Sequence, residues 1–432
     1  MNQIIARKRD RHSLSTDEIN HFIQAYTAGD IPDYQASALL MAIYLNGMDR
    51  RETVDLTLAM ARSGDQLDLH DTLDFVIDKH SSGGVGDKTT LVVLPLVAAC
   101  GVPIAKMSGR GLGFTGGTLD KMESIPGWRC DLELGQFKKQ VSEIGLALAG
   151  QTAKLAPADG KLYALRDVTS TVGSLPLIAS SIMSKKLAAG ADGIVLDVKI
   201  GSGAFVKDLE TGKTLAQTMV NIGNDAGREV LALLSDMNQP LGHAVGNRLE
   251  VIEAVQTLQN HPDTPSDFWE HCLDISKLML KLARPEIENL EETLVSARDS
   301  GAAFKKFEEM VVAQGGEARS LSRIDQFEIA PIVKPVMAPT SGHIISTDTE
   351  ALGWLIVNLG GGRLKKGDPV DHSVGFKFNY KVGDAIEAGD PMVTLHAASE
   401  TAWEKGKEAL LKSIRVGPEP VDPIPHAYGV IS

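Results

Sequence analysis

The chain has 432 residues, of which 43% are hydrophobic and 23% charged, and its formal net charge is −13. The length exceeds one hydrophobic core and predicts two or three domains, while the acidic balance argues against a general nucleic-acid-binding protein, because a phosphate backbone would be repelled. No apolar stretch reaches about 18 residues without a charge or a glycine, which argues against a membrane span, and the start of the chain lacks the apolar run of a secretory signal.

The cysteines bear on the compartment. Cys100, Cys130 and Cys272 are odd in number, far apart and set among apolar residues. This pattern predicts buried thiols and neither disulfides nor zinc ligands, because disulfides persist mainly in oxidising compartments. We therefore expect a multi-domain protein of the cytoplasm.

The first 65 residues are expected to be helical. Residues 15–18, Ser-Thr-Asp-Glu, have the pattern of a capping box, in which the serine and glutamate side chains each bond a free N–H at a helix start. Two further short helices are expected over 34–46 and 51–63. Such a small bundle buries too little area to be stable alone, so we expect it to pack against helices from elsewhere in the chain.

From about residue 72, strands alternate with helices, which predicts a largely parallel sheet. The expected strands are 73–78, 102–106, 146–149, 193–199 and 230–235, and the expected helices between them include 91–100, 134–144 and 211–226. Between 155 and 190, two helical segments interrupt the alternation. We expect these two helices to leave the sheet and join the N-terminal bundle.

The rest of the chain completes the predicted fold, which is α/β plus all-α. Helices are expected over 247–258, 266–282 and 287–313, and a β-rich tail follows residue 329. We predict a small helical domain packed across a cleft from a large α/β domain with a mixed or parallel sheet, and a β-rich C-terminal α+β subdomain. The expected boundaries are 1–66 with 155–191, 72–152 with 193–330, and 331–432.

Two glycine-rich loops carry most of the functional signal. The first, 79–90, lies between an expected strand and an expected helix, and the second is 108–120. A strand, a glycine loop and a helix start together present free backbone N–H groups to an anion, and glycine lets the backbone approach closely. Each loop alone could be a simple turn, but the two together favour an oxyanion pocket. A cation and hydroxyls are supplied by Lys79, Ser81, Thr90, Ser108 and Thr118.

The second loop also matches the dinucleotide-binding fingerprint, as Gly111-x-Gly113-x-x-Gly116. A nicotinamide site needs a helix and a strand after this motif, with an acidic residue about twenty positions on. The residues that follow do not form such a unit, so the dinucleotide interpretation is disfavoured.

A third cluster could hold a polar ring. His80 lies inside the first loop, where titration near neutrality would suit a proton donor, although it could also pack beneath the loop. Ser181 and Lys185 are four residues apart in an expected helix and share a face, to which Arg166 could add a planar donor fork. That face could equally be solvated. Lys186 lies off it and is expected at the surface.

Residues 79–87 and 108–124 closely resemble the signature of thymidine and pyrimidine-nucleoside phosphorylases, and the resemblance extends over essentially the whole chain, through 163–167, 174–187 and 196–205. It implies a homodimer with a small α domain and a large α/β domain, in which inorganic phosphate and a pyrimidine nucleoside meet in the cleft. The implied reaction is reversible phosphorolysis of uridine, thymidine or 2′-deoxyuridine, with no organic cofactor, nucleic acid or membrane involved.

The resemblance also assigns roles by position. Phosphate would be held by Lys79, Ser81, Thr90, Ser108, Gly109, Arg110 and Thr118. The nucleoside would be held by Lys106, Leu112 and Phe114 together with a catalytic set of His80, Arg166, Ser181 and Lys185. A structural K⁺ or Ca²⁺ ion would be bound by the carbonyls of Gly86, Lys88, Leu241 and Ala244 and by the Glu253 carboxylate, since such oxygens suit a hard cation. Glu253 could also be an ordinary acid on a helix surface.

Two residues bear on specificity. Phe114 stands where close relatives usually carry histidine, which replaces a hydrogen-bonding ring by an apolar one near the nucleoside. Lys106 resembles the broad-specificity pyrimidine enzymes, and we favour acceptance of both uridine and thymidine over thymidine alone.

Three alternatives differ in class or breadth. A thymidine-selective phosphorylase would catalyse the same reaction more narrowly, but such enzymes tend to carry an apolar residue at the position of Lys106. A related phosphoribosyltransferase would need a diphosphate and magnesium site, for which no paired acids flank the glycine loops. A binding protein without turnover is disfavoured by the intact set His80, Arg166, Ser181 and Lys185.

Overall fold

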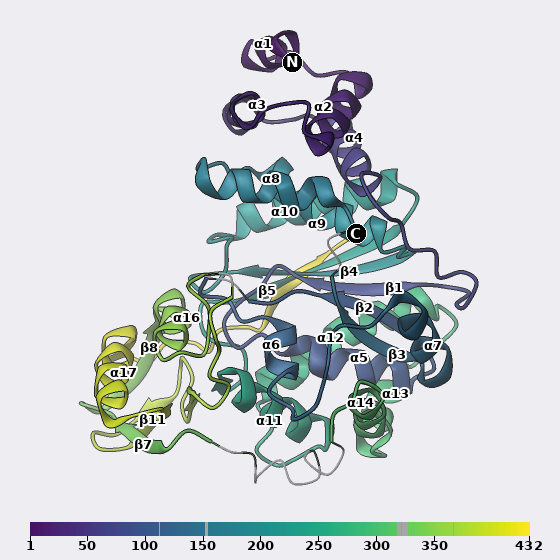
Figure 1. The fold of residues 1–432 in the computed structure, drawn as a ribbon. Helices are drawn as coiled ribbons and strands as arrows, with labels where there is room; N and C mark the ends of the chain where they lie inside the picture. The colour runs from purple at the N-terminus through teal and green to yellow at the C-terminus, as the bar shows by residue number, and fades with distance from the viewer. Residues whose placement is uncertain (112, 152–153, 318–320, 322–326, 328, 366) are drawn as a thin grey trace.

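The computed structural model describes residues 1–432 except 112, 152–153, 318–320, 322–326, 328 and 366. Helices of the N-terminal part lie at the top of Figure 1, a sheet lies beneath them with further helices under it, and a β-rich C-terminal region lies at the left. This arrangement of a helical bundle, an α/β domain with a mixed sheet and a β-rich C-terminal part confirms the predicted fold class.

The N-terminal bundle contains one helix more than predicted. The expected capping box is present, because the Ser15 hydroxyl accepts from the Glu18 N–H at 3.2 Å and the Glu18 carboxylate accepts from the Ser15 N–H at 2.7 Å. The extra helix precedes this box and buries only Ile4 and Lys8. The four helices are α1 (Asn2–Arg9), α2 (Thr16–Ala28), α3 (Asp33–Asn46) and α4 (Arg50–Ala61).

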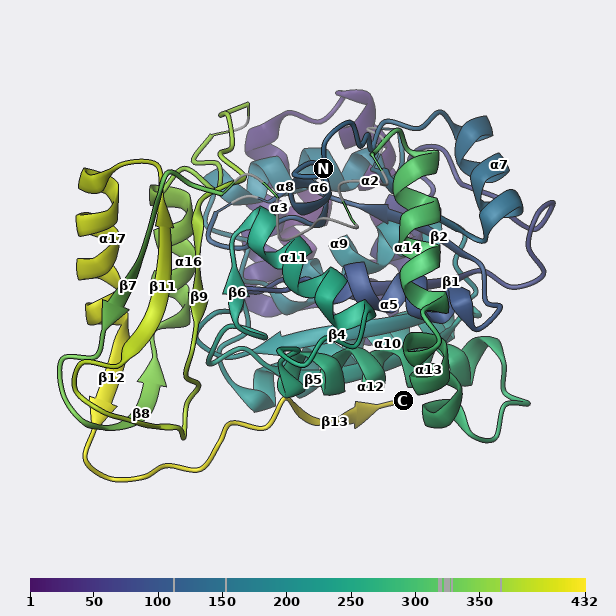
Figure 2. The same ribbon diagram turned by 90° about the horizontal axis from the view of Figure 1, so that it is seen from below.

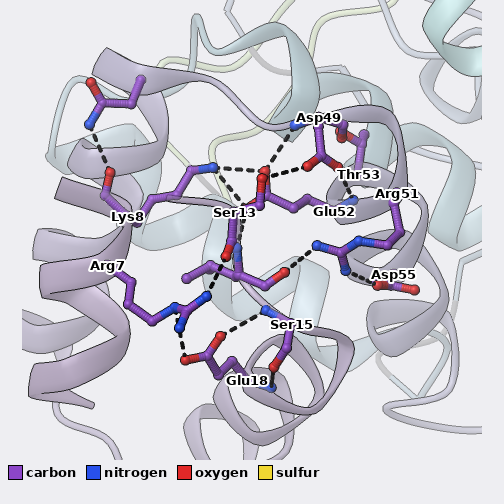
Figure 3. Close-up of polar contacts among 12 residues, drawn as sticks. Arg7, Lys8, Ser13, Ser15, Glu18, Asp49, Arg51, Glu52, Thr53 and Asp55 are labelled. Atoms are coloured by element: carbon purple, nitrogen blue, oxygen red, sulfur yellow. Dashed lines mark hydrogen bonds and ion pairs between the residues drawn. The ribbon is translucent and has the colours of Figure 1, made fainter. Parts of the chain in front are cut away.

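A buried ion pair attaches α1 to the bundle (Figure 3). The Lys8 ammonium donates to both carboxylate oxygens of Glu52, each at 2.8 Å. The same carboxylate accepts the backbone N–H groups of Leu14 at 2.8 Å and Asp49 at 2.9 Å. Glu52 therefore joins α1, the turn before α2 and the start of α4, which a hydrophobic pattern does not reveal.

We expect Glu52→Ala to release α1 from the bundle. The substitution leaves the Lys8 ammonium buried without its partner, which typically costs about 3–5 kcal/mol. Hydrogen exchange of the α1 amides and the thermal unfolding midpoint measure the effect. Arg9→Ala is the control, because its pair with Asp10 is exposed and should leave both readouts unchanged. Equal protection of α1 in the Glu52 variant and the unaltered protein would contradict this role.

The central sheet has the strand order β1-β4-β5-β13. Strands β1 (Ile77–Ser81), β4 (Gly193–Ile200) and β5 (Glu229–Asp236) are parallel, and β13 (Ala427–Ile431) is antiparallel to β5. The last strand therefore returns from the C-terminal region to the main sheet (Figure 2). In this respect the structure differs from the predicted boundary, which placed all of 331–432 in a separate subdomain. A second parallel pair consists of β2 (Ile104–Ser108) and β3 (Leu146–Gly150).

Helices cover both faces of the central sheet, as Figure 1 shows. On β4, Leu196 and Val198 belong to one hydrophobic cluster, with α9 (Leu175–Ala188) and α10 (Leu209–Asp225), whereas Val195 belongs to another, with α5 (Thr89–Ala99) and α12 (Ser266–Ala283). A strand buried on both faces is expected for a parallel sheet. The remaining helices of this region are α6 (Thr118–Met122), α7 (Leu134–Ile144), α8 (Pro157–Val168), α11 (Asn247–Leu258), α13 (Leu290–Asp299) and α14 (Ala302–Ala313).

The helices that interrupt the strand alternation pack on the N-terminal bundle. Ala158 and Leu162 of α8 and Leu177 of α9 share one hydrophobic cluster with Phe22 and Leu39. Because α9 also packs on the face of β4, it connects the bundle to the sheet.

Two predicted elements differ from the structure. The strand expected over 73–78 begins only at Ile77, because its pairing is set by β4, where Ile77 lies opposite Gly193. The single helix expected over 287–313 is two helices, α13 and α14, and Gly301 between them has φ +79°, a conformation that ends a helix.

The C-terminal region is built from two antiparallel sheets and two helices. One sheet has the order β6-β9-β11-β7 and the other β10-β8-β12. Among the described residues, no helix has both the length and the apolar character needed to cross a bilayer. The elements are β6 (Ala244–Val245), β7 (Ile332–Met337), β8 (Gly342–Thr347), α16 (Thr349–Asn358), β9 (Gly375–Phe378), β10 (Ala385–Ile386), β11 (Pro391–Ala397), α17 (Glu400–Ser413) and β12 (Ile414–Gly417).

Candidate active site

The glycine loops meet at the carboxyl ends of parallel strands, where α/β folds commonly bind ligands. Lys79, His80 and Ser81 form the end of β1, and Ser108 ends β2. These ends border a cavity of about 180 Å³. Its lining includes nine predicted residues, Lys79, His80, Ser81, Thr90, Lys106, Ser108, Gly109, Arg110 and Thr118. Others that the sequence analysis did not select are Gly83, Asp87, Met107, Gly116, Gly117, Gln151 and Lys186.

Lys79 brings an uncompensated donor into this cavity. Its side chain is fully buried, and among the described residues its ammonium has no hydrogen-bond partner. The nearest carboxylate oxygen, on Asp197, is 3.7 Å away and already accepts from Lys199 at 2.9 Å and contacts His271, while the other Asp197 oxygen accepts from Ser235. A buried ammonium with free N–H groups is costly unless an anion satisfies it, so this group is suited to hold phosphate.

A second pair of lysines shares one carboxylate beside the cavity. Asp78 contacts the ammonium groups of Lys106 at 3.1 Å and Lys186 at 2.9 Å. Although burial opposes its ionisation, these two charges hold the pKa of Asp78 well below its usual value. Burial lowers the pKa of Lys106 to about 7, against the charge of Asp78. Lys186 was expected at the surface, but it is 2% exposed, because its ammonium reaches into the fold and pairs with Asp78 of β1.

His80 does not have the near-neutral pKa that the sequence analysis expected. Burial, with the neighbouring charges of Lys186 and Lys106, holds the pKa of His80 well below its usual value. The imidazole is therefore neutral at pH 7 and can donate one N–H without being a cation. The charge of Lys185 also lowers this pKa.

Asp87 shapes the first loop. The Ser81 hydroxyl donates to one Asp87 carboxylate oxygen at 2.5 Å, and the Thr89 N–H donates to the other at 3.3 Å. Although burial opposes its ionisation, the charges of Lys79 and Lys199 lower the pKa of Asp87. The carboxylate thus fixes the loop just before α5, whose first turn carries Thr90 and directs its helix dipole toward an anion in the cavity.

The second loop is closed by a contact that only glycine permits. A Cβ atom on Gly117 would lie 2.0 Å from the Gly111 nitrogen. The Gly111 N–H donates to Asp120 at 2.7 Å, and the other Asp120 oxygen accepts from Arg363 at 2.7 Å. Arg110 lines the cavity while its guanidinium pairs with Glu123.

The predicted base-binding face lies next to the same cavity. The Lys185 ammonium donates to Ser181 at 3.1 Å and to Asp159 at 2.5 Å, a partner that the sequence analysis did not identify. Lys185 borders a small hollow that shares Met107, Gln151 and Lys186 with the cavity of the glycine loops. The two predicted halves of the site are therefore neighbours.

Arg166 is positioned by backbone carbonyls. Its guanidinium donates to the carbonyls of Thr171 at 3.3 Å, Val172 at 2.6 Å and Leu177 at 3.2 Å, which ties the end of α8 to the start of α9. Burial lowers its pKa. A guanidinium has five N–H donors, so two remain beyond these three bonds.

The two remaining predicted nucleoside contacts are Leu112 and Phe114. Leu112 lies outside the described residues. Phe114 packs its ring 5.7 Å from that of Phe205 and 6.1 Å from that of Trp354, between centroids. It borders a separate hollow between α11 and α16 and does not line the cavity that holds Lys79.

Three of the five predicted cation ligands contact the side chain of Lys88. The Lys88 ammonium donates to the carbonyls of Leu241 at 2.5 Å and Ala244 at 3.1 Å and pairs with the Glu253 carboxylate. Glu253 is 4% exposed, so it is a buried partner and not an acid of a helix surface.

Comparison with known proteins matches three consecutive family models to this chain. They are the helical bundle domain of a glycosyl transferase family over 2–64, the α/β domain of that family over 73–304, and the pyrimidine nucleoside phosphorylase C-terminal domain over 343–417. The fold is also similar to anthranilate phosphoribosyltransferase from Thermus thermophilus, with a TM-score of 0.58 at 18% identity over 72% of this chain and 99% of that one.

Full-length relatives are much closer in sequence. A pyrimidine-nucleoside phosphorylase of Staphylococcus aureus is 49% identical over 98% of both chains. One of Geobacillus stearothermophilus is 48% identical over the whole of both chains. With this identity over its full length, the chain belongs to the pyrimidine-nucleoside phosphorylase family.

Proposed function

We infer that this protein is an enzyme, a pentosyltransferase that catalyses the reversible phosphorolysis of pyrimidine nucleosides to a free base and an α-D-pentose 1-phosphate. One observation carries the inference: Lys79, whose buried ammonium has no hydrogen-bond partner among the described residues, is one of the residues that line a cavity formed by both glycine loops. Full-length similarity to pyrimidine-nucleoside phosphorylases supports the same activity.

Inorganic phosphate binds in the cavity of the glycine loops. Lys79 supplies the charge, and the hydroxyls of Ser108, Thr90 and Thr118 line the same space. The N-terminal turn of α5 adds its dipole. The buried carboxylates Asp78 and Asp197 are each matched by lysines, so they do not repel the anion. Gly109, Arg110 and Ser81 complete this binding set as lining residues.

The pyrimidine ring binds against the face of α9 that carries Ser181 and Lys185. The ammonium is held by Asp159 and Ser181, and it keeps one further N–H for a ring oxygen. Arg166 supplies cationic donors to the same ring, through the two N–H groups that its guanidinium retains. His80 supplies an uncharged donor, the single N–H of its neutral imidazole.

The reaction transfers the pentosyl group between the two sites. A phosphate oxygen forms a bond to C1′ while the C1′–N1 bond breaks, and its electron pair moves onto the pyrimidine ring. The negative charge spreads to the ring oxygens, where Lys185, Arg166 and His80 stabilise it. The neutral His80 imidazole donates its one N–H as a hydrogen bond to the departing base, which leaves as an anion and takes its proton from water. No organic cofactor takes part.

The activity is tested by phosphate-dependent release of uracil or thymine from uridine, thymidine and 2′-deoxyuridine, followed by chromatography of base and sugar phosphate. We propose that uridine and thymidine are both cleaved, because Lys106 lies in the cavity lining. Cleavage of thymidine alone would restrict the proposal to a thymidine-selective enzyme. If no base is released, or if release does not depend on phosphate, the proposed function is wrong.

We also propose that two copies associate through the helical bundle. Helix α3 exposes large apolar side chains, with Tyr34 74% and Leu45 72% exposed, and Val168 at the end of α8 is 78% exposed. Such a grouping is uncommon on a monomer surface. The free thiols of Cys100, Cys130 and Cys272 support a cytoplasmic location.

Leu45→Glu is expected to shift sedimentation velocity from dimer toward monomer, because a buried unpaired carboxylate would oppose association. Val312→Glu is the control, since Val312 is also exposed (51%) but lies on α14, away from the bundle. A monomeric unaltered protein at micromolar concentration would contradict this assembly.

A further inference from the structure

The Lys88 ammonium occupies a site with the oxygen donors of a cation site. Two carbonyl oxygens, of Leu241 and Ala244, and one carboxylate oxygen, of Glu253, contact it. An ammonium has three N–H donors and no acceptor, so these three oxygens satisfy it completely. The side chain is fully buried, and its nitrogen lies 4.8 Å from the centre of the Phe268 ring, which adds a cation–π contact.

The surroundings are built tightly around this charge. The other oxygen of the Glu253 carboxylate accepts the N–H groups of His243, at 3.1 Å, and Ala244, at 3.0 Å. A Cβ atom on Gly242 would lie 2.4 Å from a Glu253 oxygen and 2.7 Å from the Lys88 nitrogen. Gly242 has φ +67°, so the turn needs glycine for its conformation as well as for space.

The site joins segments that are far apart in the chain. Lys88 immediately precedes α5, and the carbonyls it binds lie more than 150 residues further on, in the 241–244 turn. Gly86, two residues before Lys88, approaches the same turn so closely that a Cβ atom there would be 2.9 Å from the Leu241 carbonyl oxygen. A positive charge at this point therefore holds the first glycine loop and the start of α5 against the 241–244 turn.

These oxygens do not fit a resident metal ion in this chain. The resemblance to the phosphorylase family placed K⁺ or Ca²⁺ among the carbonyls of Gly86, Lys88, Leu241 and Ala244 and the Glu253 carboxylate. The Lys88 side chain instead places its own charge against three of those ligands. A second cation at the same oxygens would be repelled at contact distance, in an environment where burial makes the repulsion strong.

We propose that the ε-ammonium of Lys88 takes the place of a bound metal cation, so that this protein keeps its first glycine loop in position without K⁺ or Ca²⁺. Potassium and ammonium carry the same charge and both accept carbonyl-oxygen coordination. Because the ammonium is covalently attached, its presence requires no binding of an ion from solution and does not depend on the salt present. The 241–244 turn and the phosphate-binding cavity are therefore insensitive to the choice of monovalent cation.

The test compares thermal unfolding midpoints of the full chain in chlorides of tetramethylammonium, potassium and sodium at equal ionic strength, and with added calcium. The unaltered protein should have the same midpoint in all of them, and elemental analysis should find no stoichiometric K⁺ or Ca²⁺. Lys88→Thr removes the ammonium, leaves space and adds an oxygen. Its midpoint should fall in tetramethylammonium and recover saturably, by about 3 °C or more, when K⁺ or Ca²⁺ is added.

Lys88→Met is the matched control. Its side chain fills the same space without charge, so its midpoint should fall and show no recovery with any cation. A saturable rise in the midpoint of the unaltered protein with K⁺ or Ca²⁺, or a stoichiometric bound ion, would overturn the proposal. So would a Lys88→Thr midpoint that no cation restores. If that variant does not fold, the measurements on the unaltered protein still decide, and none of them depends on phosphorolysis.

Discussion

Lys79→Met is expected to raise the KM for phosphate by about a hundredfold to a thousandfold, with little change in the KM for nucleoside. The ammonium is buried and lacks a hydrogen-bond partner among the described residues, so the anion would be its main compensation. Hydrogen bonds to charged groups contribute roughly 1.5–3 kcal/mol each, and the loss of two at the lower end of this range, about 3–4 kcal/mol, corresponds to a change of this size. Methionine keeps the length of the side chain and leaves Asp197 paired with Lys199.

Steady-state phosphorolysis at varied phosphate and fixed nucleoside measures the effect. Lys199→Met is the buried control, because Lys199 contacts the same Asp197 but does not line the cavity. It should lower thermal stability more than phosphate affinity. If the two variants lose phosphate affinity equally, the cavity is not the phosphate site and the loss reflects the Asp197 network alone.

Lys185→Met is expected to lower kcat by about a hundredfold or more while the KM for phosphate stays nearly constant. In the proposed reaction the ammonium donates to the departing base, on which negative charge develops, and removing one such donor typically costs about 10²–10³ in kcat. Asp159 and Ser181 hold the ammonium in place, and neither borders the cavity of the glycine loops.

A nucleoside with a better leaving group separates this role from a structural one. 5-Fluorouridine releases a base that carries negative charge more easily, so the Lys185→Met deficit should be smaller for it than for uridine. Lys185→Arg keeps the charge and should recover part of the rate. An equal deficit for both nucleosides would sink the assignment of Lys185 to the leaving group.

Local signals in the sequence predicted most of the helices. The capping box at Ser15 was correct because it depends on residues three positions apart. The start of β1 was wrong because the residues before Ile77 alternate like a strand but precede the first residue that pairs with β4, which sets the register. Helix α1 was not predicted, because it lacks the apolar face that marks an amphipathic helix. A buried ion pair between Lys8 and Glu52, 44 residues away, holds it in place instead.

The candidate active site shows the same contrast between features that local sequence signals predict and features that tertiary contacts decide. Nine predicted residues line the cavity, since the two glycine loops end neighbouring strands. Phe114 does not, because its ring packs against Phe205 and Trp354. Lys186 was wrongly expected at the surface, because the spacing of residues along a helix does not show which other part of the chain packs against each face. His80 was expected to titrate near neutrality, and only burial beside Lys106 and Lys186 reveals the lowered pKa.

Amino-acid order alone specified the fold class and the two glycine-rich loops, because glycine spacing and hydrophobic periodicity are short-range properties. The resemblance of residues 79–87 and 108–124 to known signatures indicated the phosphorylase family. The charge states and partners of the lysines were decided only when the chain folded. Asp78 meets Lys186 across 108 residues, and Lys88 meets the Leu241 carbonyl across 153. Burial and pairing over such separations distinguish the Lys79 ammonium, which we propose binds phosphate, from the Lys88 ammonium, which we propose replaces a metal ion. No local sequence pattern encodes this difference.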